Sequence, residues 1–166
     1  MAGFSGWVKT GPNITKQAID ATSTTLENAL GTRCTARHAS YGEAEFIYLV
    51  GVASTGQSDW VTFDEAYTTT RTVADAKGRV GVSMSANVAS QYGWYCIYGR
   101  VPAGVLSSFA DNGVVFLSAT AGHIDDADVA GDKVEGAIGR GAIDDPNTGQ
   151  AWMELNFPFV DDADGE

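Results

Sequence analysis

The chain is poor in the residues that build metal, disulfide and membrane-spanning structures. Its 166 residues include two Cys, two His and four Pro. Cys34 and Cys96 are far apart in the sequence and form no CxxC or Cys/His spacing, which predicts two buried thiols; a disulfide is left open. No run approaches the ~20 apolar residues of a membrane span, and the N-terminus, MAGFSGWVKTGP, lacks the basic start and apolar centre of a signal peptide. We therefore expect no membrane partner and synthesis in a cytoplasm.

Motifs for catalysis and nucleotide binding are missing as well. The sequence has no GxSxG nucleophile elbow, no GxxxxGK[ST] loop and no GxGxxG turn between a strand and a helix. We interpret His38, one of the two histidines, as a loop or strand-end residue. In HIDDADVAGDKVEG, Asp126 and Asp128 match the start of an EF-hand loop, but Ala137 stands where the bidentate Glu belongs. A calcium site of another type stays open; otherwise we predict no metal, no cofactor and no enzyme.

The negative charge is concentrated near the C-terminus. The net charge is −11, and residues 123–166 hold twelve Asp and Glu against two Lys and Arg, so the rest of the chain is close to neutral. Such an acidic surface repels phosphate backbones, which disfavours direct nucleic-acid binding. The contrast suggests one acidic, hydrated side and another side available for docking.

Short strands dominate what remains. The 20 Gly, with abundant Thr, Ser and Val, favour strands and turns over helices. Alternation and β-branched or aromatic runs predict strands at 30–41, 45–50, 59–64, 67–73, 80–84, 92–101, 114–120, 123–124, 134–143 and 151–157. Those at 59–64 and 67–73 form a hairpin, and the glycines of 134–143 indicate a bulge. We predict a mainly β fold: a single compact β-barrel or sandwich of eight to ten short strands.

The stretch 81–101 is the expected centre of the sheet. In a strand at 92–101, Trp94 and Cys96 share one face while Tyr95 and Ile97 share the other. Apolar side chains on both faces are typical of a central strand. We expect Pro102 to end it.

The chain ends differ from this body. Residues 1–28 have no clear apolar period and are predicted to form an extended N-terminal arm that lies on the domain or on a neighbouring subunit, or frays. Residues 29–160 form the β-rich domain, and 161–166 form an acidic, solvated tail. The arm offers four apolar residues for docking: Trp7, Val8, Ile14 and Ile19.

Several segments resemble one family of virion proteins. They are ALGTR at 29–33, EFIY at 45–48, GVAST at 51–55, DWVT at 59–62, SANVASQYGW at 85–94, ATAG at 119–122 and VAGDK at 129–133. Together they resemble the capsid decoration, or cement, proteins of tailed bacteriophages, over about residues 29–160 and as an overall pattern. The arm lies outside the resemblance.

The resemblance implies a virion structural protein on the outer capsid surface. Such a protein stabilises the head by bridging major capsid protein subunits, and it acts as a homo-oligomer such as a trimer. We expect Trp7, Val8, Ile14 and Ile19 to contact the capsid or a neighbouring subunit. Deleting residues 1–25 is then expected to leave the melting temperature nearly unchanged and to weaken attachment.

A second hypothesis is a carbohydrate-binding or host-contact module of a tail fibre or spike. It rests on five aromatic residues that suit sugar stacking, provided they are exposed: Trp60, Trp94, Tyr95, Tyr98 and Trp152. Packing in the core or at an interface is the competing interpretation.

Overall fold

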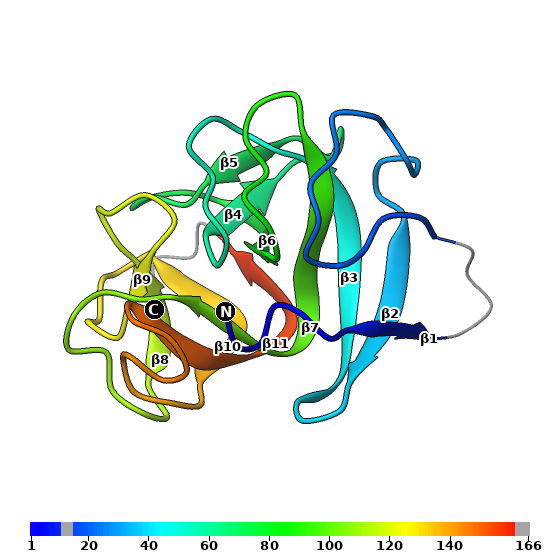
Figure 1. Ribbon diagram of the computed structural model, residues 1–166. Helices are drawn as coiled ribbons and strands as arrows, with labels where there is room; N and C mark the ends of the chain where they lie inside the picture. Colours follow the sequence, from blue (N-terminus) through cyan, green and yellow to red (C-terminus); the bar gives the residue numbers. More distant parts are fainter. Residues whose placement is uncertain (11–14, 162–166) are drawn as a thin grey trace.

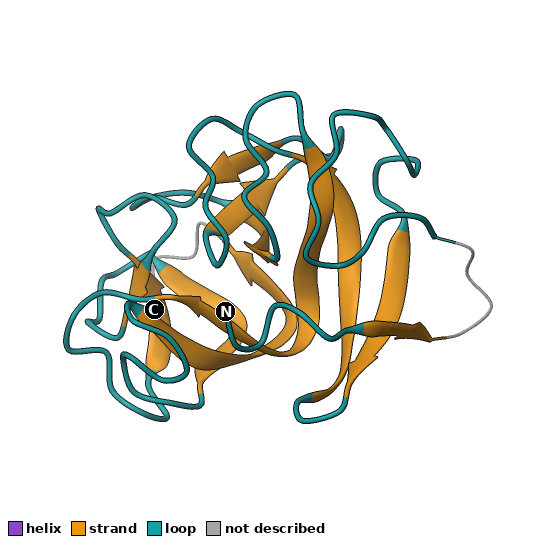
Figure 2. Cartoon of the chain, viewed as in Figure 1, coloured by secondary structure: helices purple, strands orange, loops and turns teal. Residues whose placement is uncertain are grey.

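The computed structural model describes residues 1–10 and 15–161, and these residues form strands and loops without any helix (Figures 1 and 2). The mainly β prediction is confirmed. In chain order the strands are β1 (Val8–Thr10), β2 (Arg33–His38), β3 (Gly42–Val50), β4 (Trp60–Phe63), β5 (Thr69–Arg71), β6 (Gly78–Ser83), β7 (Tyr92–Gly104), β8 (Val114–Leu117), β9 (Ile124–Asp125), β10 (Lys133–Gly139) and β11 (Gln150–Val160).

All eleven strands belong to one antiparallel sheet, with the order β1-β2-β3-β7-β6-β11-β10-β8-β9 and with β4 placed between β5 and β6. The order is open, because β1 and β9 stand at its two ends without pairing to each other. The number exceeds the expected eight to ten partly because β1, a three-residue strand, forms in the segment that was predicted to be an arm. Closure into a barrel or sandwich stays a prediction.

Strand β7 is the centre of the sheet, as predicted. Its first half pairs with β3 and β6, and its second half pairs with β11. Trp94 and Cys96 lie in a large apolar cluster on one face, whereas Tyr95 and Ile97 lie in a small apolar cluster on the other. Both faces of β7 are therefore buried from Gly93 to Ile97, which explains the lack of polar alternation in this part of the strand.

The prediction that Pro102 ends this strand is wrong. Pro102 lies within β7 and is paired in register with Trp152 of β11. In this half β7 has β11 as its strand neighbour, since its pairs with β3 and β6 end at Tyr98 and Cys96. A proline is tolerated where its missing N–H would point away from the neighbouring strand.

The small cluster consists of Ile47, Leu49, Val61, Tyr95 and Ile97. It is enclosed because β3, β7, β6, β4 and β5 curl round it, in the upper part of Figure 1. The curl returns to its first strand: Thr68 forms a parallel bridge with Val50, and the Thr69 hydroxyl donates to the Val50 carbonyl at 2.8 Å.

The large cluster is covered by the described parts of the chain's own N-terminal segment, residues 1–10 and 15–28. The side chains of Phe4 and Ile19 are buried in this cluster, and β1 extends the sheet by pairing with β2. In Figure 1 the first residues cross β7 and β11 before reaching β1, and the chain then returns across β7 and β3. The segment thus lies on the domain, one of the two arrangements expected for it.

Hydrogen bonds to Gln17 fasten this cover. The Gln17 side chain donates to the carbonyls of Ala21 and Tyr92 and accepts from the Tyr48 hydroxyl at 2.6 Å, while its own carbonyl accepts from Trp94 Nε1 at 3.1 Å. Lys9 Nζ donates to the carbonyls of residues 15–17 and lies 5.2 Å from the centre of the Trp94 ring. Burial lowers the Lys9 pKa.

This packing changes the expectation for removal of residues 1–25. Two buried apolar side chains would be lost together with Gln17 and all of its hydrogen bonds. Each large-to-small change of a buried Phe or Ile costs about 2–5 kcal/mol. The truncated chain is therefore expected to be strongly destabilised, not nearly unchanged.

Candidate functional site

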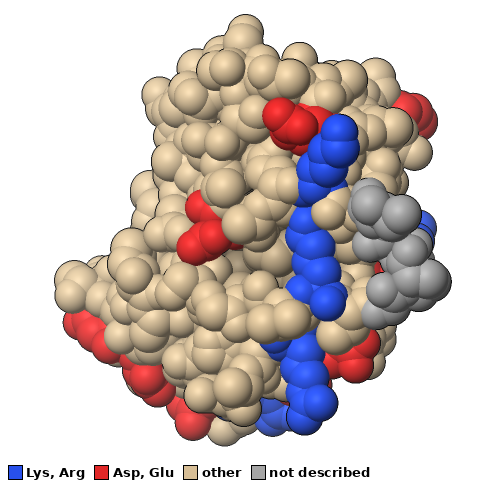
Figure 3. All heavy atoms as spheres, turned by 45° about the vertical axis from the view of Figure 1, so that its right-hand side comes forward, with Lys and Arg blue, Asp and Glu red and all other residues tan. Residues whose placement is uncertain are grey.

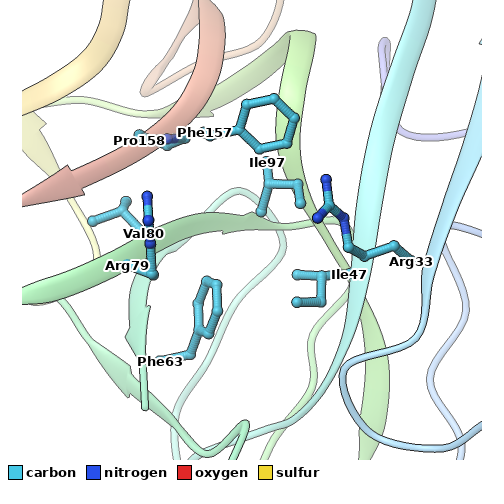
Figure 4. Close-up of a pocket in the computed structure, with 8 residues that line it drawn as sticks. All are labelled: Arg33, Ile47, Phe63, Arg79, Val80, Ile97, Phe157 and Pro158. Atoms are coloured by element: carbon cyan, nitrogen blue, oxygen red, sulfur yellow. The ribbon is translucent and has the colours of Figure 1, made fainter. Parts of the chain in front are cut away.

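The small cluster opens to solvent at one end, and we call this opening the mouth. It is a cavity of about 270 Å³ lined by Arg33, Ile47, Phe63, Arg79, Val80, Ile97, Phe157 and Pro158. Figure 4 shows apolar side chains from several strands around a common space, with the two arginines on opposite sides of it. Since the floor of this space is the buried small cluster, the mouth is an apolar recess with a charged rim.

Strand pairing explains how distant residues meet here. Ile47 on β3 is directly opposite Arg33 on β2 and Tyr95 on β7. Successive residues of a strand point to opposite faces. Ile47 and Ile97 therefore lie in the small cluster, whereas their neighbours Phe46 and Cys96 lie in the large one. On the other side of the recess, β6 contributes Arg79 and Val80, and β4 contributes Phe63.

Phe157 is held in an unusual backbone conformation at the mouth. Its φ is +48°, a left-handed value that bulky residues rarely adopt. It lies where β11 leaves β7, whose last pair is Asn156 with Tyr98, and reaches β6, whose first pair is Phe159 with Arg79. Such a conformation costs about 1–3 kcal/mol and persists only where the surroundings impose it. The result is a 37% exposed ring beside Tyr98, with ring centres 5.5 Å apart.

The two arginines give the rim its electrostatic character. Arg33 forms an ion pair with Glu45 and lies 5.2 Å over the ring of Phe157, whereas Arg79 lies 5.8 Å over the ring of Phe159. The lining of the mouth includes these two cations and no acid, in a chain whose net charge is −11. Elsewhere, too, basic side chains gather: Figure 3 shows Lys and Arg in a line down one face.

Of the residues that the sequence nominated for docking, the three that the structure describes, Trp7, Val8 and Ile19, do not line the mouth. Trp7 is half-buried, with its ring 5.2 Å from that of Phe46, and Ile19 is buried in the large cluster. Val8 is 68% exposed on β1 and is thus accessible to a partner. Ile14 lies outside the described residues. Because Trp7 and Ile19 serve the protein's own packing, Val8 is, among the three described members of the set, the one with a free apolar surface.

The aromatic residues proposed for sugar stacking are mostly core residues. Trp60, Trp94, Tyr95 and Trp152 are buried. Only Tyr98 of the five is accessible, at 45% exposure. It lines a separate hollow of about 450 Å³, together with Tyr41, Glu43, Gly99, Arg100, Glu154, Leu155 and Asn156. A glycan site, if present, would have to be built around this hollow.

The histidines and the acidic residues have structural contacts. His38 stacks on Tyr41 with ring centres 4.2 Å apart, and His123 Nδ1 is 3.3 Å from the Ala121 carbonyl. Asp132 accepts from the backbone amide of Asp75, and Asp126 accepts from that of Ala110. Within residues 1–10 and 15–161, no group of three His, Cys, Asp or Glu side chains is arranged to hold a metal ion. Over the same residues, no helix of the length and apolarity needed to cross a bilayer is found.

Both cysteines are buried free thiols, which confirms the sequence prediction. Burial raises the pKa of Cys34 to about 11 and raises that of Cys96 further. The thiolate, which is the nucleophilic form, is therefore disfavoured at both positions near neutral pH.

The mouth was missed in the sequence because its residues come from six strands: β2, β3, β4, β6, β7 and β11. One local signal was available: Pro158 follows Phe157 inside a β-prone run, and a proline within a strand indicates an edge or an irregularity. The expected strand ended at Phe157, so the continuation of β11 to Val160 and its pairing with β6 were not foreseen.

No family model, no curated protein and no solved structure matches this chain. The family resemblance noted in the sequence therefore stays a prediction, and the argument about function rests on the residues and their geometry.

Proposed function

We propose that the protein is a non-enzymatic virion structural protein that binds the outer surface of a tailed-bacteriophage head and bridges major capsid protein subunits. In this proposal it is a surface clamp, working as a homo-oligomer such as a trimer, without a cofactor. Its body is a compact barrel-like or sandwich-like arrangement of the sheet.

One observation supports this role most strongly. The protein seals its large apolar cluster with its own N-terminal segment but leaves the small cluster open at the mouth, beside the exposed rings of Phe157 and Tyr98. Apolar surface that a protein leaves uncovered often marks a contact with another macromolecule. A body in which the first half of the central strand is buried on both faces also suits a mechanical part, because such a packed core resists deformation.

Repeated binding amplifies modest contacts. Each copy contributes a limited area, yet an oligomer that contacts several capsid subunits at once gains avidity through effective concentration. The acidic segment 123–166 is consistent with a surface that faces solvent instead of DNA.

Electron microscopy tests the proposal directly. Heads assembled from the major capsid protein of the same genome should be imaged with and without the purified chain. We expect added density on the capsid exterior at sites that span neighbouring subunits, and we expect higher resistance of these heads to heat. Heads that bind no protein at saturating concentration would contradict the proposal.

Glycan binding is a second candidate, favoured by the hollow at Tyr41 and Tyr98. Two aromatic side chains, two carboxylates and an amide line it, which is the mixture that sugar faces and hydroxyls require. The test is a glycan array with the intact chain and with Tyr98→Ala. Variants at Trp60 or Trp152 are unsuitable, because both side chains are buried and their removal would disturb the fold.

A further inference from the structure

We propose that the mouth is a docking point for a partner-protein segment that inserts one large apolar side chain and places a neighbouring carboxylate against a rim arginine. The inference rests on the proposed function only for the identity of the partner, which is then the major capsid protein. The chemistry of the segment follows from the mouth itself.

The size of the cavity selects a side chain over a cofactor. At about 270 Å³ it lies just below the range of about 300–1,000 Å³ that drug-sized ligands and cofactors occupy. Its walls are aliphatic and aromatic: Ile47, Ile97, Val80, Phe63 and Phe157. A Leu-sized or Phe-sized side chain fits such a recess, and its burial would complete the small cluster as Phe4 and Ile19 complete the large one.

The rim selects an anion beside that side chain. Arg79 is exposed, and its guanidinium carbon lies 5.8 Å from the centre of the Phe159 ring. Arg33, across the mouth, is already paired with Glu45. A guanidinium next to an apolar recess favours a carboxylate, which it binds through two parallel N–H groups. Arg79 is therefore the arginine that we assign to the partner's acid.

The conformation of Phe157 is an independent indication that its ring is used. Glycine or asparagine would occupy a φ of +48° with less strain, and neither would place a ring at the mouth. The chain instead keeps a strained, exposed aromatic residue between Arg33 and Tyr98. Strain retained at an exposed aromatic is expected where the ring serves binding.

The first test uses short capped peptides and the intact chain. In a ¹⁵N NMR titration, acetyl-Asp-Leu-Asp-amide should give saturable shifts at the amides of Ile97 and Phe157. Acetyl-Asn-Leu-Asn-amide should bind about fivefold more weakly, which corresponds to about 1 kcal/mol for an exposed ion pair. Acetyl-Asp-Ala-Asp-amide should give no saturable shift, because it lacks the apolar side chain. Shifts that never saturate, or that map away from the mouth, would overturn the proposal.

Variants separate binding from folding. Phe157→Gly should melt at the same temperature as the parent or higher, because strain is relieved, and it should lose the peptide response. Phe157→Asn repeats this test with a residue that also tolerates the left-handed region. Arg79→Gln should bind the Asp and Asn peptides equally. Val114→Ser removes an exposed apolar side chain that is not part of the mouth and should change nothing. Full peptide binding by folded Phe157→Gly would reject the assignment.

Capsid binding then distinguishes the two proposals. If heads bind the parent chain but lose at least about tenfold in affinity for Phe157→Gly, the effect of truncating a central aromatic anchor, both stand. Equal binding of the parent and Phe157→Gly rejects the mouth and leaves the capsid role intact. Peptide binding without any head binding rejects the capsid role alone. Self-association of the chain that Phe157→Gly abolishes, without a peptide response, would show that a second copy fills the mouth and would also overturn the inference.

Discussion

The two apolar clusters of this protein lie on opposite faces of β3 and β7 and are closed by different means. On one face, the N-terminal segment covers the large cluster with Phe4 and Ile19 and is fastened by hydrogen bonds to Gln17. On the other face, curled strands enclose the small cluster but leave the mouth open. Residues on both faces of β3 and β7 are apolar, yet only the face with the large cluster is completely covered.

Under the proposed docking role, this difference separates a part of the chain that serves folding from a part that serves contact. The N-terminal segment, which has no apolar period, completes the core. The mouth, which lies within the regular sheet, keeps an exposed aromatic ring and two arginines. The predictions below test this division, starting with the largest expected effect.

Deleting residues 1–25 should nearly abolish the cooperative thermal transition. The deletion uncovers the large cluster and removes Phe4 and Ile19, each worth about 2–5 kcal/mol, against a total stability of about 5–15 kcal/mol for a typical domain. Thermal unfolding followed by near-UV circular dichroism measures this. A truncated chain that melts within a few degrees of the parent would show that the segment is an appendage after all.

Alkaline pH should weaken the covered side of the molecule. Burial raises the pKa of Cys34 from 9.0 to about 11 and raises that of Cys96 further. A pKa raised by folding contributes stability that is present below the unfolded value and is lost as pH rises through the folded value. The free energy of unfolding of the parent chain should thus decrease between pH 9 and 11. The decrease should be larger than in the Cys34→Ala variant, which lacks this thiol. Thiolate absorbance appearing in the folded protein near pH 9 would contradict a sealed cluster.

Gln17→Ala should lower the free energy of unfolding by about 1–3 kcal/mol, since it leaves buried partners without hydrogen bonds. The control is Gln57→Ala, because Gln57 Nε2 makes one hydrogen bond, to the Met84 carbonyl at 2.9 Å. Urea titration measures the free energy of unfolding of both variants, in which the same atoms of a Gln side chain are removed. An equal effect of both substitutions would mean that Gln17 does not fasten the segment.

Of two Tyr→Phe substitutions, one should lower the free energy of unfolding and the other should not. Tyr48→Phe removes the hydroxyl that donates to Gln17 and should cost about 1 kcal/mol. The hydroxyl of Tyr95 is buried among Thr69, Ser83 and Asn87 without a hydrogen bond of acceptable geometry, and burial raises its pKa to about 12. Tyr95→Phe should therefore be neutral or stabilising by up to about 1 kcal/mol. Urea titration measures both. A clear loss of stability in Tyr95→Phe would show that this hydroxyl has a partner.

The sequence predicted the regular part of the fold because local pattern and tertiary environment agree there. The apolar residues on both faces of Trp94 to Ile97 placed β7 at the centre of the sheet. The glycines of the expected strand 134–143 indicated a bulge, and β10 has one at Gly136, between Glu135 and Ala137. The N-terminal segment could not be predicted in this way. Phe4 and Ile19 are buried by contacts with residues far along the chain, and such contacts leave no local periodicity.

The mouth could not be predicted from the sequence for a related reason. The mouth exists only because strands from distant parts of the chain curl back to a bridge between Thr68 and Val50. The left-handed conformation of Phe157 depends on the change of partner strand, from β7 to β6, on either side of it. Pattern analysis finds side chains that share a face, but it does not reveal which faces remain uncovered.

Hydroxyl-radical footprinting with mass spectrometry compares both regions in one experiment. Phe4 and Phe157 are read out in the free protein and in protein bound to heads. We expect Phe4 to be protected in both states, whereas Phe157 should be oxidised in the free protein and protected on the capsid. Oxidation of Phe4 in the free protein, or equal oxidation of Phe157 in both states, would contradict the division between a self-covered cluster and a mouth kept for a partner.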